Sequence, residues 1–213
     1  DDVAAVHFFH YTPDTLLVRH DSPFQTVDEL VAHARANPGR VTLSGSGKGS
    51  ANHIAQIRFD GLAAIETSYV AFRGTGAAIT ALLGAQVAGQ WGYTSAGVTY
   101  GDRVRSLAVA MEARHPKLPD VPTFRELGYD LVSGAYRGVG VPDSTDEVTR
   151  QRISDVIAEI NGDPAFVERM ENGGFALIDV PYDRMAAFMT QKRAEYEAAA
   201  KAAGLAPSLE PEG

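Results

Sequence analysis

The chain contains no cysteine among its 213 residues. This absence excludes disulfide bonds, thiolate metal sites and thiol catalysis, and it is compatible with an oxidising or a reducing compartment. Basic residues are also few, because 19 Lys and Arg stand against 27 Asp and Glu and give a formal net charge of -8. A broad phosphate-binding surface is therefore not expected, and we predict no nucleic-acid partner.

Long apolar runs are missing as well. The longest ones, such as residues 79–83, are too short to cross a bilayer, so we do not expect the chain to be membrane-inserted. The first three residues, Asp-Asp-Val, do not resemble a basic and apolar export signal, and we expect such a signal to be absent from this chain. Hydrophobic residues make up 45% of the sequence, which is ordinary for a globular protein with a substantial core.

Short strand-like runs alternate with amphipathic helical stretches, which predicts an α/β protein with a largely parallel sheet. Three segments, 26–29, 123–126 and 144–147, fit the capping box, in which a hydroxyl and a carboxylate satisfy backbone amides where a helix begins. Apolar residues at helical spacing from Pro181 onward predict a long C-terminal helix, followed by a tail at 206–213. The expected strands are 3–9, 15–19, 40–44, 66–72, 86–91, 105–111, 138–141 and 175–180.

The segment 42–50, Thr-Leu-Ser-Gly-Ser-Gly-Lys-Gly-Ser, follows a strand and precedes a helical pattern. Its glycines let a ligand approach backbone amides at the helix N-terminus, Ser50 can cap the helix, and Lys48 adds a positive charge. The segment predicts an anion site or, as the simpler alternative, a glycine-rich turn with a helix cap. The candidate ligand residues are Ser44, Gly45, Ser46, Gly47, Lys48, Gly49 and Ser50.

This segment matches neither common nucleotide-binding motif. A phosphate loop needs Ser or Thr directly after the lysine, where this chain has Gly49, and it needs a glycine where this chain has Thr42. The alternating glycines also have the wrong spacing for the dinucleotide fingerprint. We therefore expect no nucleotide and no other cofactor.

Two further strand ends carry possible ligand groups. Residues 72–78 repeat the order of strand, glycine turn, hydroxyl and helix, and we rank the turn above the neighbouring Arg73. Residues 90–97 place the only Trp beside a Tyr and two hydroxyls, which is typical of a pocket wall and equally compatible with a buried Trp. We read residues 128–142 as a crossing between two lobes that could close the site from the far side. The candidates are Gly74, Thr75, Gly76, Trp91, Tyr93, Thr94, Ser95 and, in the crossing, Tyr136.

The six histidines do not form a catalytic or metal-binding set. His7 and His10 are close in sequence but lack a third ligand with metal-like spacing. Ser50 and His53 lie on adjacent helix turns, but no carboxylate orients them and there is no nucleophile elbow. We therefore predict no enzyme and no metal site, and we place His53 on the helix surface near the mouth of the ligand site.

These motifs occur in the same order as in a known receptor family. Residues 22–30 and 36–39 lead to the glycine loop, residues 69–76 resemble a Val-Pro-Tyr-Lys-Gly segment, and residues 118–128 contain Leu-Pro-Asp-Val-Pro-Thr before Glu-Leu-Gly. With these motifs the chain resembles the substrate-binding receptors of tripartite tricarboxylate transporters, the TctC or Bug family of periplasmic proteins. The resemblance runs through nearly the whole chain.

The resemblance implies a two-lobed periplasmic-binding-protein fold of type II, with Rossmann-like lobes and mixed sheets. Lobe 1 should comprise residues 1–13 and 133–213, and lobe 2 residues 14–132. The family's N-terminal strand, glycine loop and helix are absent before Asp1, so lobe 1 should be incomplete. Residues 91–94, Trp-Gly-Tyr-Thr, stand where many members have Phe-Asp-Asn-Leu, and Ala71 and Phe72 replace the usual Pro and Tyr, which favours an altered, aromatic-walled pocket.

The resemblance also implies the function. We expect a monomeric periplasmic receptor that closes by hinge motion on a small carboxylate, either a di- or tricarboxylate or an aromatic carboxylate, and presents it to membrane transporter subunits. A cytoplasmic ligand-sensing domain of a transcription regulator is the main alternative, because such domains can share the two-lobed architecture. An enzyme that uses Ser50 and His53 is a second alternative.

Overall fold

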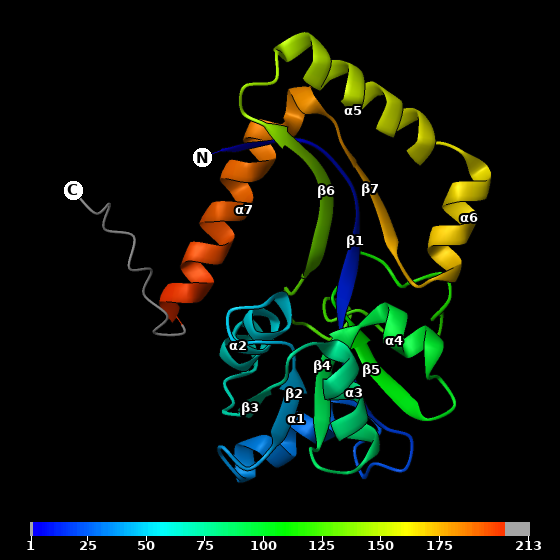
Figure 1. The fold of residues 1–213 in the computed structure, drawn as a ribbon. Helices are drawn as coiled ribbons and strands as arrows, with labels where there is room; N and C mark the ends of the chain where they lie inside the picture. The colour runs from blue at the N-terminus through cyan, green and yellow to red at the C-terminus, as the bar shows by residue number, and fades with distance from the viewer. Residues whose placement is uncertain (1, 203–213) are drawn as a thin grey trace.

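The computed structural model describes residues 2–202, which form two bodies joined by a long strand (Figure 1). We keep the predicted boundaries as names and call residues 14–132 lobe 2, and residues 2–13 with 133–202 lobe 1. Strand β1 (Val3–Arg19) passes through both lobes. It pairs with β6 (Gly134–Pro142) as far as Pro13 and with β4 and β5 from Asp14 onward. The two strands expected at 3–9 and 15–19 are therefore one, because β1 changes partners without ending.

Lobe 2 contains a mixed sheet with the strand order β3-β2-β4-β1-β5. Strand β2 (Thr42–Gly45) is parallel to β3 (Ser68–Ala71) and β4 (Gly89–Tyr93), whereas β1 is antiparallel to β4 and β5 (Val104–Val109). The expectation of a largely parallel sheet is thus corrected, because the long β1 enters between β4 and β5. The helices of lobe 2 are α1 (Val27–Ala36), α2 (Ala51–Ala63), α3 (Thr75–Leu83) and α4 (Thr94–Thr99).

The core of lobe 2 consists of two apolar clusters on opposite faces of this sheet, because Leu16 and Val18 of β1 belong to the larger cluster and Leu17 belongs to the smaller one. Helix α1 buries Val27, Leu30, Val31 and Ala34, which recur at the spacing of one helix face. Aromatic rings fill the centre, where the Trp91 ring stacks on a phenylalanine, with centroids 5.5 Å apart. Burial of each such side chain contributes about 1.5–3 kcal/mol, so these clusters are the main source of stability in lobe 2.

Lobe 1 is built on β1, which is flanked by β6 and β7 (Ala176–Val180). Helices α5 (Glu147–Asn161) and α6 (Pro164–Asn172) lead to β7, and α7 (Tyr182–Ala202) descends toward α2 of lobe 2 (Figure 1). The long C-terminal helix predicted from Pro181 onward is confirmed. The tail expected at 206–213 lies outside the described residues.

Two of the predicted capping boxes form both of their hydrogen bonds. At α1, the Glu29 amide donates to Thr26 Oγ1 at 3.2 Å, and the Thr26 amide donates to the Glu29 carboxylate at 3.2 Å. The same reciprocal pair joins Thr123 and Glu126, yet residues 123–128 form a turn and no helix. The reason is Gly128, which has φ +87 and redirects the chain after a single turn.

The helix start predicted at Ser144 is wrong by two residues. Asp146 is the cap of α5, and its carboxylate accepts the Thr149 amide at 2.9 Å. Arg150 donates to the Thr145 carbonyl at 2.8 Å and so holds that residue outside the helix. A carboxylate caps a helix as well as a hydroxyl does, and Ser144 and Asp146 are only two residues apart. The capping pattern alone therefore does not decide between them.

Candidate functional site

The loops that follow β2, β3 and β4 lie at one edge of the lobe 2 sheet, because these three strands run in the same direction. This edge faces lobe 1, and helices α2 and α4, which begin there, lie on the side of lobe 2 nearest lobe 1 in Figure 1. Thr94 at this edge donates its hydroxyl to the Gly174 carbonyl of lobe 1 at 2.6 Å. The fold therefore gathers the predicted ligand segments at the junction of the lobes.

The glycine loop, residues 46–50, begins α2 as predicted. Ser50 caps the helix, since its Oγ accepts the His53 amide at 3.4 Å. Gly49 has φ +78, a conformation that residues with a side chain rarely adopt. Gly47, Lys48 and Gly49 are exposed, and a Cβ on either glycine would meet nothing within 4 Å. A ligand has room to reach the backbone here.

Tyr69 of β3 covers the base of this loop and was not selected from the sequence. Its hydroxyl donates to the Ser46 carbonyl at 2.6 Å, and its ring lies 4.5 Å from the His53 ring. A Cβ at Gly45 would lie 2.1 Å from the Tyr69 hydroxyl, which explains the glycine at that position. Burial raises the pKa of Tyr69 to about 12, so the phenol remains a neutral donor at physiological pH.

His53 helps to hold the loop. Its Nδ1 accepts the Gly49 amide at 3.1 Å, and the side chain is half-buried. Burial, followed by the charge of Lys48, lowers the pKa of His53 below its usual value. The imidazole is therefore neutral at pH 7, which is the state that can accept this hydrogen bond.

A chain of hydrogen bonds leads from the loop into the protein interior. Ser46 Oγ lies 2.6 Å from Asn52 Oδ1, and Asn52 Nδ2 donates to Asp14 Oδ1 at 2.8 Å. The other carboxylate oxygen of Asp14 accepts the Ser133 hydroxyl at 2.8 Å. These contacts connect the glycine loop of lobe 2 to Ser133, the residue of the crossing at which lobe 1 resumes.

Asp14 is the most unusual titratable group in this region, and it too was not selected from the sequence. It is completely buried. Burial raises the pKa of Asp14 to about 7, against the opposing effects of its hydrogen bonds from Ser133 and Asn52 and the charge of Arg58. The sequence contains one signal for this role: Asp14 is an acidic residue between two apolar, strand-like runs. Burial of a carboxylate is costly, so an acidic residue at such a position is a candidate for a functional group.

The second loop, Gly74–Gly76, is open but differs in its cap. Thr75 was expected to cap α3 with its hydroxyl, whereas the structure makes Gly74 the cap and Thr75 the first helical residue. No side chain caps this helix, and a Cβ on Gly74 or Gly76 would meet nothing within 4 Å. The amides of the first turn of α3 therefore need an acceptor from outside the helix.

Two predicted site residues are corrected to core residues. Trp91 is completely buried between Phe59 and Phe124, and so it is not a pocket wall. Ser44 is also completely buried, and its hydroxyl lies 3.4 Å from the carbonyl oxygens of Ala78 and Gly89. Both belong to strands inside the sheet, where Phe59 of α2 covers Trp91 and Ala78 of α3 covers Ser44.

In the third predicted segment, residues 90–97, Tyr93 differs from Thr94 and Ser95 in its surroundings. Tyr93 is half-buried, and burial raises its pKa to about 12, with the charge of Asp14 as the next contribution. Thr94 is completely buried in its contact with Gly174. A Cβ on Gly174 would lie 2.9 Å from the Ser95 amide nitrogen, so lobe 1 covers this short helix start. Tyr93 remains a candidate ligand residue, whereas Thr94 and Ser95 contact lobe 1.

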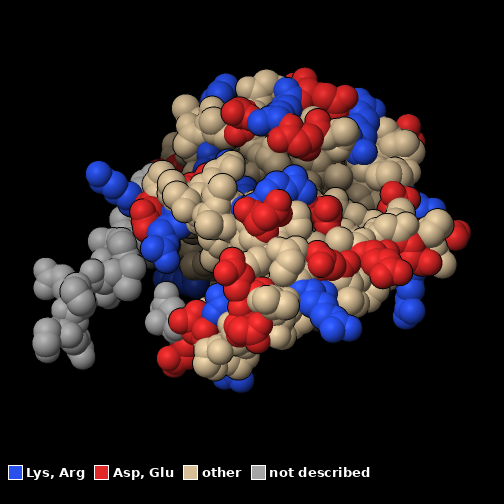
Figure 2. All heavy atoms as spheres, turned by 90° about the horizontal axis from the view of Figure 1, so that it is seen from above, with Lys and Arg blue, Asp and Glu red and all other residues tan. Residues whose placement is uncertain are grey.

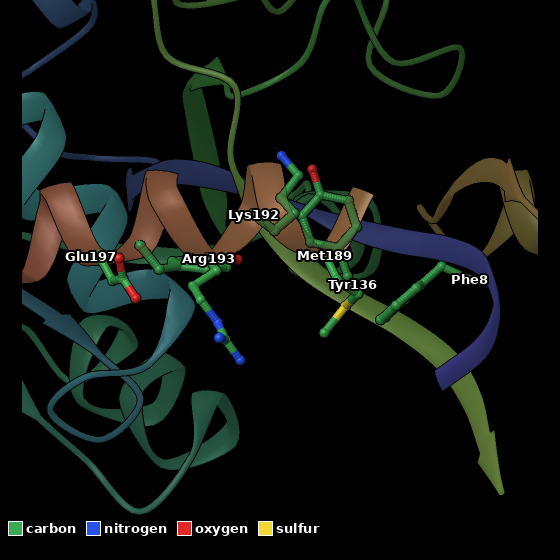
Figure 3. A pocket seen from close by; sticks show the side chains of 7 residues that line it. Phe8, Tyr136, Met189, Lys192, Arg193 and Glu197 are labelled. Carbon is green, nitrogen blue, oxygen red and sulfur yellow. The ribbon is translucent and has the colours of Figure 1, made fainter. Parts of the chain in front are cut away.

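Tyr136 lies in lobe 1, where it lines a cavity of about 570 Å³ between β1, β6 and α7 (Figure 3). Its ring stacks on Tyr11 at 5.3 Å, and the Lys192 ammonium lies 4.8 Å from the ring centroid. Tyr196 lines the same cavity. Burial is the main cause that raises the pKa of Tyr196, and the charges of Tyr136 and Asp14 raise it further.

Three general properties of the described residues bear on function. None of the helices within residues 2–202 has the length and apolar character needed to cross a membrane. In the same range, no three His, Asp or Glu side chains are grouped so that they could hold a metal ion. On the face shown in Figure 2, acidic and basic side chains are interspersed, and basic ones do not gather in a broad patch.

Comparisons with known proteins identify a family. The model described as the tripartite tricarboxylate transporter family receptor matches residues 1–205. A protein from Pseudomonas sp. strain P51, described as the UPF0065 protein in the tcbD-tcbE intergenic region, is 31% identical over 172 residues, which are 76% of this chain and 49% of that protein. Protein BugT of Bordetella pertussis is 28% identical over 68% of this chain and 46% of its own length. The chain thus spans about half the length of these relatives.

Solved structures share the fold. The periplasmic binding protein BugD has 25% identity and a TM-score of 0.82, and the match covers 95% of this chain and 69% of BugD. R. palustris Rpa4515 with adipate has 23% identity and a TM-score of 0.86, with the same two coverages. MatC from Rhodopseudomonas palustris with bound malate has 21% identity and a TM-score of 0.77, covering 94% of this chain and 69% of MatC. The predicted two-lobed α/β receptor fold is therefore confirmed.

Proposed function

This chain belongs to the tripartite tricarboxylate transporter receptor family, and we propose that it binds a small carboxylate in the periplasm and presents it to the membrane subunits of such a transporter. The observation that carries the carboxylate is the start of α3, whose first amides have no side-chain cap and open onto free space. Backbone amides at a helix N-terminus attract negative charge. The glycine loop and Lys48 supply the same chemistry at the start of α2.

In this proposal the ligand lies at the junction of the lobes. Lobe 2 contributes the glycine loop around Ser46 and Ser50, the α3 start around Thr75, and Tyr93. Lobe 1 closes over the ligand by bending of β1 and of the crossing near Ser133, where the strands leave lobe 2. Adipate and malate in two proteins of the same fold favour a dicarboxylate.

Calorimetric titration of the chain with adipate, malate, citrate and benzoate tests this function. We expect at least one acid to bind, and Thr75→Ala to weaken binding by about 1 kcal/mol, roughly fivefold, through the loss of a hydrogen bond to a charged group. Thr80→Ala is the matched control, because Thr80 is exposed further along α3 and donates its hydroxyl to the Gly76 carbonyl at 3.0 Å. If none of the four acids binds, the carboxylate assignment is wrong.

A further inference from the structure

Helices α2, α3 and α4 begin at the ligand edge, the edge of the lobe 2 sheet that carries the loops after β2, β3 and β4. Within residues 2–202, none of these three helices has an acidic residue as its cap or in its first turn. The other four helices of this range begin elsewhere (Figure 1), and each has at least one. These acidic residues are Asp28 and Glu29 in α1, Asp146 and Glu147 in α5, Asp163 in α6, and Asp183 in α7. A carboxylate stabilises a helix start, so the three helices at the ligand edge lack this contribution from the protein itself.

Helices α1 and α2 have the same hydrogen bonds at their starts and differ in charge. At α1, Thr26 Oγ1 accepts the Glu29 amide at 3.2 Å, and the Glu29 carboxylate accepts the amide of the residue before the cap at 2.5 Å. At α2, Ser50 Oγ accepts the His53 amide at 3.4 Å, and His53 Nδ1 accepts the amide of the residue before the cap, Gly49, at 3.1 Å. His53 therefore has the place that Glu29 has in the capping box of α1.

The surroundings of His53 keep this acceptor uncharged. Burial, followed by the charge of Lys48, lowers the pKa of His53, so the imidazole is neutral at pH 7 and above. The Tyr69 ring lies 4.5 Å from the imidazole and is also neutral, because its pKa is raised to about 12. Asp14 is completely buried, and both of its carboxylate oxygens accept hydrogen bonds from neutral side chains in the interior. The groups that contact the start of α2 thus bring no negative charge to its surface.

The hydrogen bonds of the glycine loop also decide which amides remain for a ligand. His53 accepts the Gly49 amide, and the Gly47 carbonyl accepts the Ser50 amide at 3.1 Å. Among residues 2–202, the amides of Gly47 and Lys48 have no acceptor, and both residues are exposed. The bond from Gly49 to His53 directly follows these two donors in the chain, so it limits how far they can move.

We propose that His53 is a positioning residue of the carboxylate site, which holds the Gly49 amide with an uncharged acceptor and so leaves the Gly47 and Lys48 amides to a negatively charged ligand. The inference rests on the proposed function and deepens it, because it gives a reason why the site selects an anion. The start of α2 has the hydrogen bond of an acidic cap residue without its charge. A bound carboxylate then supplies the negative charge that Glu29 supplies at α1.

Four variants separate the hydrogen bond from the charge. His53→Ala removes the acceptor, His53→Gln replaces it by an uncharged one, and His53→Glu replaces it by a charged one of the same length. Glu29→Gln is the matched control, because it changes one charge at the same position of α1, which lies at the end of lobe 2 far from lobe 1 (Figure 1). Calorimetry with adipate and malate at pH 8 and low salt measures Kd, and urea unfolding measures stability.

The Kd of His53→Ala should rise about fivefold, and His53→Gln should restore it to within about twofold of the parent chain. The Kd of His53→Glu should rise about tenfold through repulsion of the ligand, and added salt should reduce this effect. The unfolding midpoint of His53→Glu should nevertheless be at least that of His53→Gln, since a carboxylate suits the first turn of a helix. Glu29→Gln should leave Kd unchanged. Equal Kd values for His53→Gln and His53→Glu overturn the proposal, and so does a His53→Ala variant that binds as tightly as the parent chain.

A measurement on the free chain distinguishes this proposal from the proposed function. In NMR spectra without ligand, hydrogen exchange of the Gly49 amide should be slower in the parent chain and in His53→Gln than in His53→Ala. Equal exchange in all three overturns the positioning role, even if the acids bind. If the Gly49 amide behaves as expected and neither acid binds the parent chain, the failure lies with the proposed function.

Discussion

Lobe 2 and lobe 1 share strand β1 but are packed differently. Both clusters of buried apolar side chains belong to lobe 2. In lobe 1, α5 buries only Ser154, and α6 has no buried residue. Within residues 2–202, six of the seven large apolar side chains that are exposed also belong to lobe 1: Val3, Val148, Val156, Ile160, Met189 and Tyr196.

Specific polar contacts hold lobe 1 together where apolar burial is small. His7 Nδ1 lies 3.0 Å from Ser154 Oγ, and His7 Nε2 lies 3.1 Å from Asp179 Oδ1. Ser154 Oγ also accepts the Tyr182 amide at 3.0 Å, so four elements meet at this point. The order of Ser, His and Asp matches a hydrolase triad, but Ser154 and His7 are completely buried, and no substrate can reach the hydroxyl.

Because their packing differs, the two lobes should also differ in local stability. Apolar burial is the dominant favourable contribution to folding, and lobe 2 has most of it. Regions with few buried apolar contacts open at a lower free energy than the rest of a domain. We therefore expect lobe 2 to be the stable platform that presents the ligand loops, and lobe 1 to be the part that moves.

The largest test of this difference is Phe124→Ala in the lobe 2 core. Phe124 is completely buried against Trp91 and Phe59, so its truncation should lower the free energy of unfolding by about 3–5 kcal/mol. Phe166→Ala in α6 removes the same ring from a half-buried position and should cost about 1 kcal/mol or less. Urea unfolding followed by circular dichroism measures both. Equal losses would mean that the lobes are packed alike.

Asp14→Asn should change how stability depends on pH at the boundary between the lobes. Because the pKa of Asp14 is raised, the folded chain keeps this proton to higher pH than the unfolded chain, so its contribution to stability falls as pH rises from about 4 to about 7 and is constant above. From pH 5 to pH 8 the parent chain should lose about 3 kcal/mol more than Asp14→Asn. Urea unfolding at the two pH values measures this difference.

Asp60→Asn is the variant with which the effect of Asp14→Asn on the pH dependence of stability is compared. The pKa of Asp60 is raised to about 6, so the same linkage predicts a smaller loss of about 1 kcal/mol over this range. Equal pH dependence of the parent chain and Asp14→Asn would show that Asp14 is ionised in the folded protein at pH 5.

Thr94→Val should loosen lobe 1 without changing the core of lobe 2. The substitution keeps the shape of the side chain but removes the buried hydrogen bond to the Gly174 carbonyl, which should cost about 1–2 kcal/mol. Hydrogen exchange should become faster at the amides of α6 and β7, while β2 and β4 keep their protection. Thr80→Val, on the exposed face of α3, is the control. Faster exchange throughout both lobes would contradict the separation.

The sequence predicts the local parts of this site well and the long-range parts poorly. The glycine loop and its Ser50 cap depend on neighbours within four residues, so glycine and capping chemistry are enough to find them. Hydrogen bonds join Asp14 to Asn52 and to Ser133, which lie 38 and 119 residues away in the sequence. A single sequence contains no signal for such long-range pairs. The sequence leaves both a pocket wall and a buried core position open for Trp91, because a local pattern does not reveal that β4 is covered on both faces.

The smallest predicted effect comes from a surface position in lobe 1. Val156 in α5 is 51% exposed, whereas Val31 in α1 is 4% exposed, and both lie inside helices. Val→Ala improves helix propensity by the same few tenths of a kcal/mol at each position, so the difference between the two variants isolates burial. Val156→Ala should change the free energy of unfolding by about 0.5 kcal/mol or less, while Val31→Ala should lower it by about 1–2 kcal/mol. A loss at Val156 as large as that at Val31 would show that another molecule or segment buries this face of lobe 1 in solution, and the contrast between the lobes would then belong to the isolated chain alone.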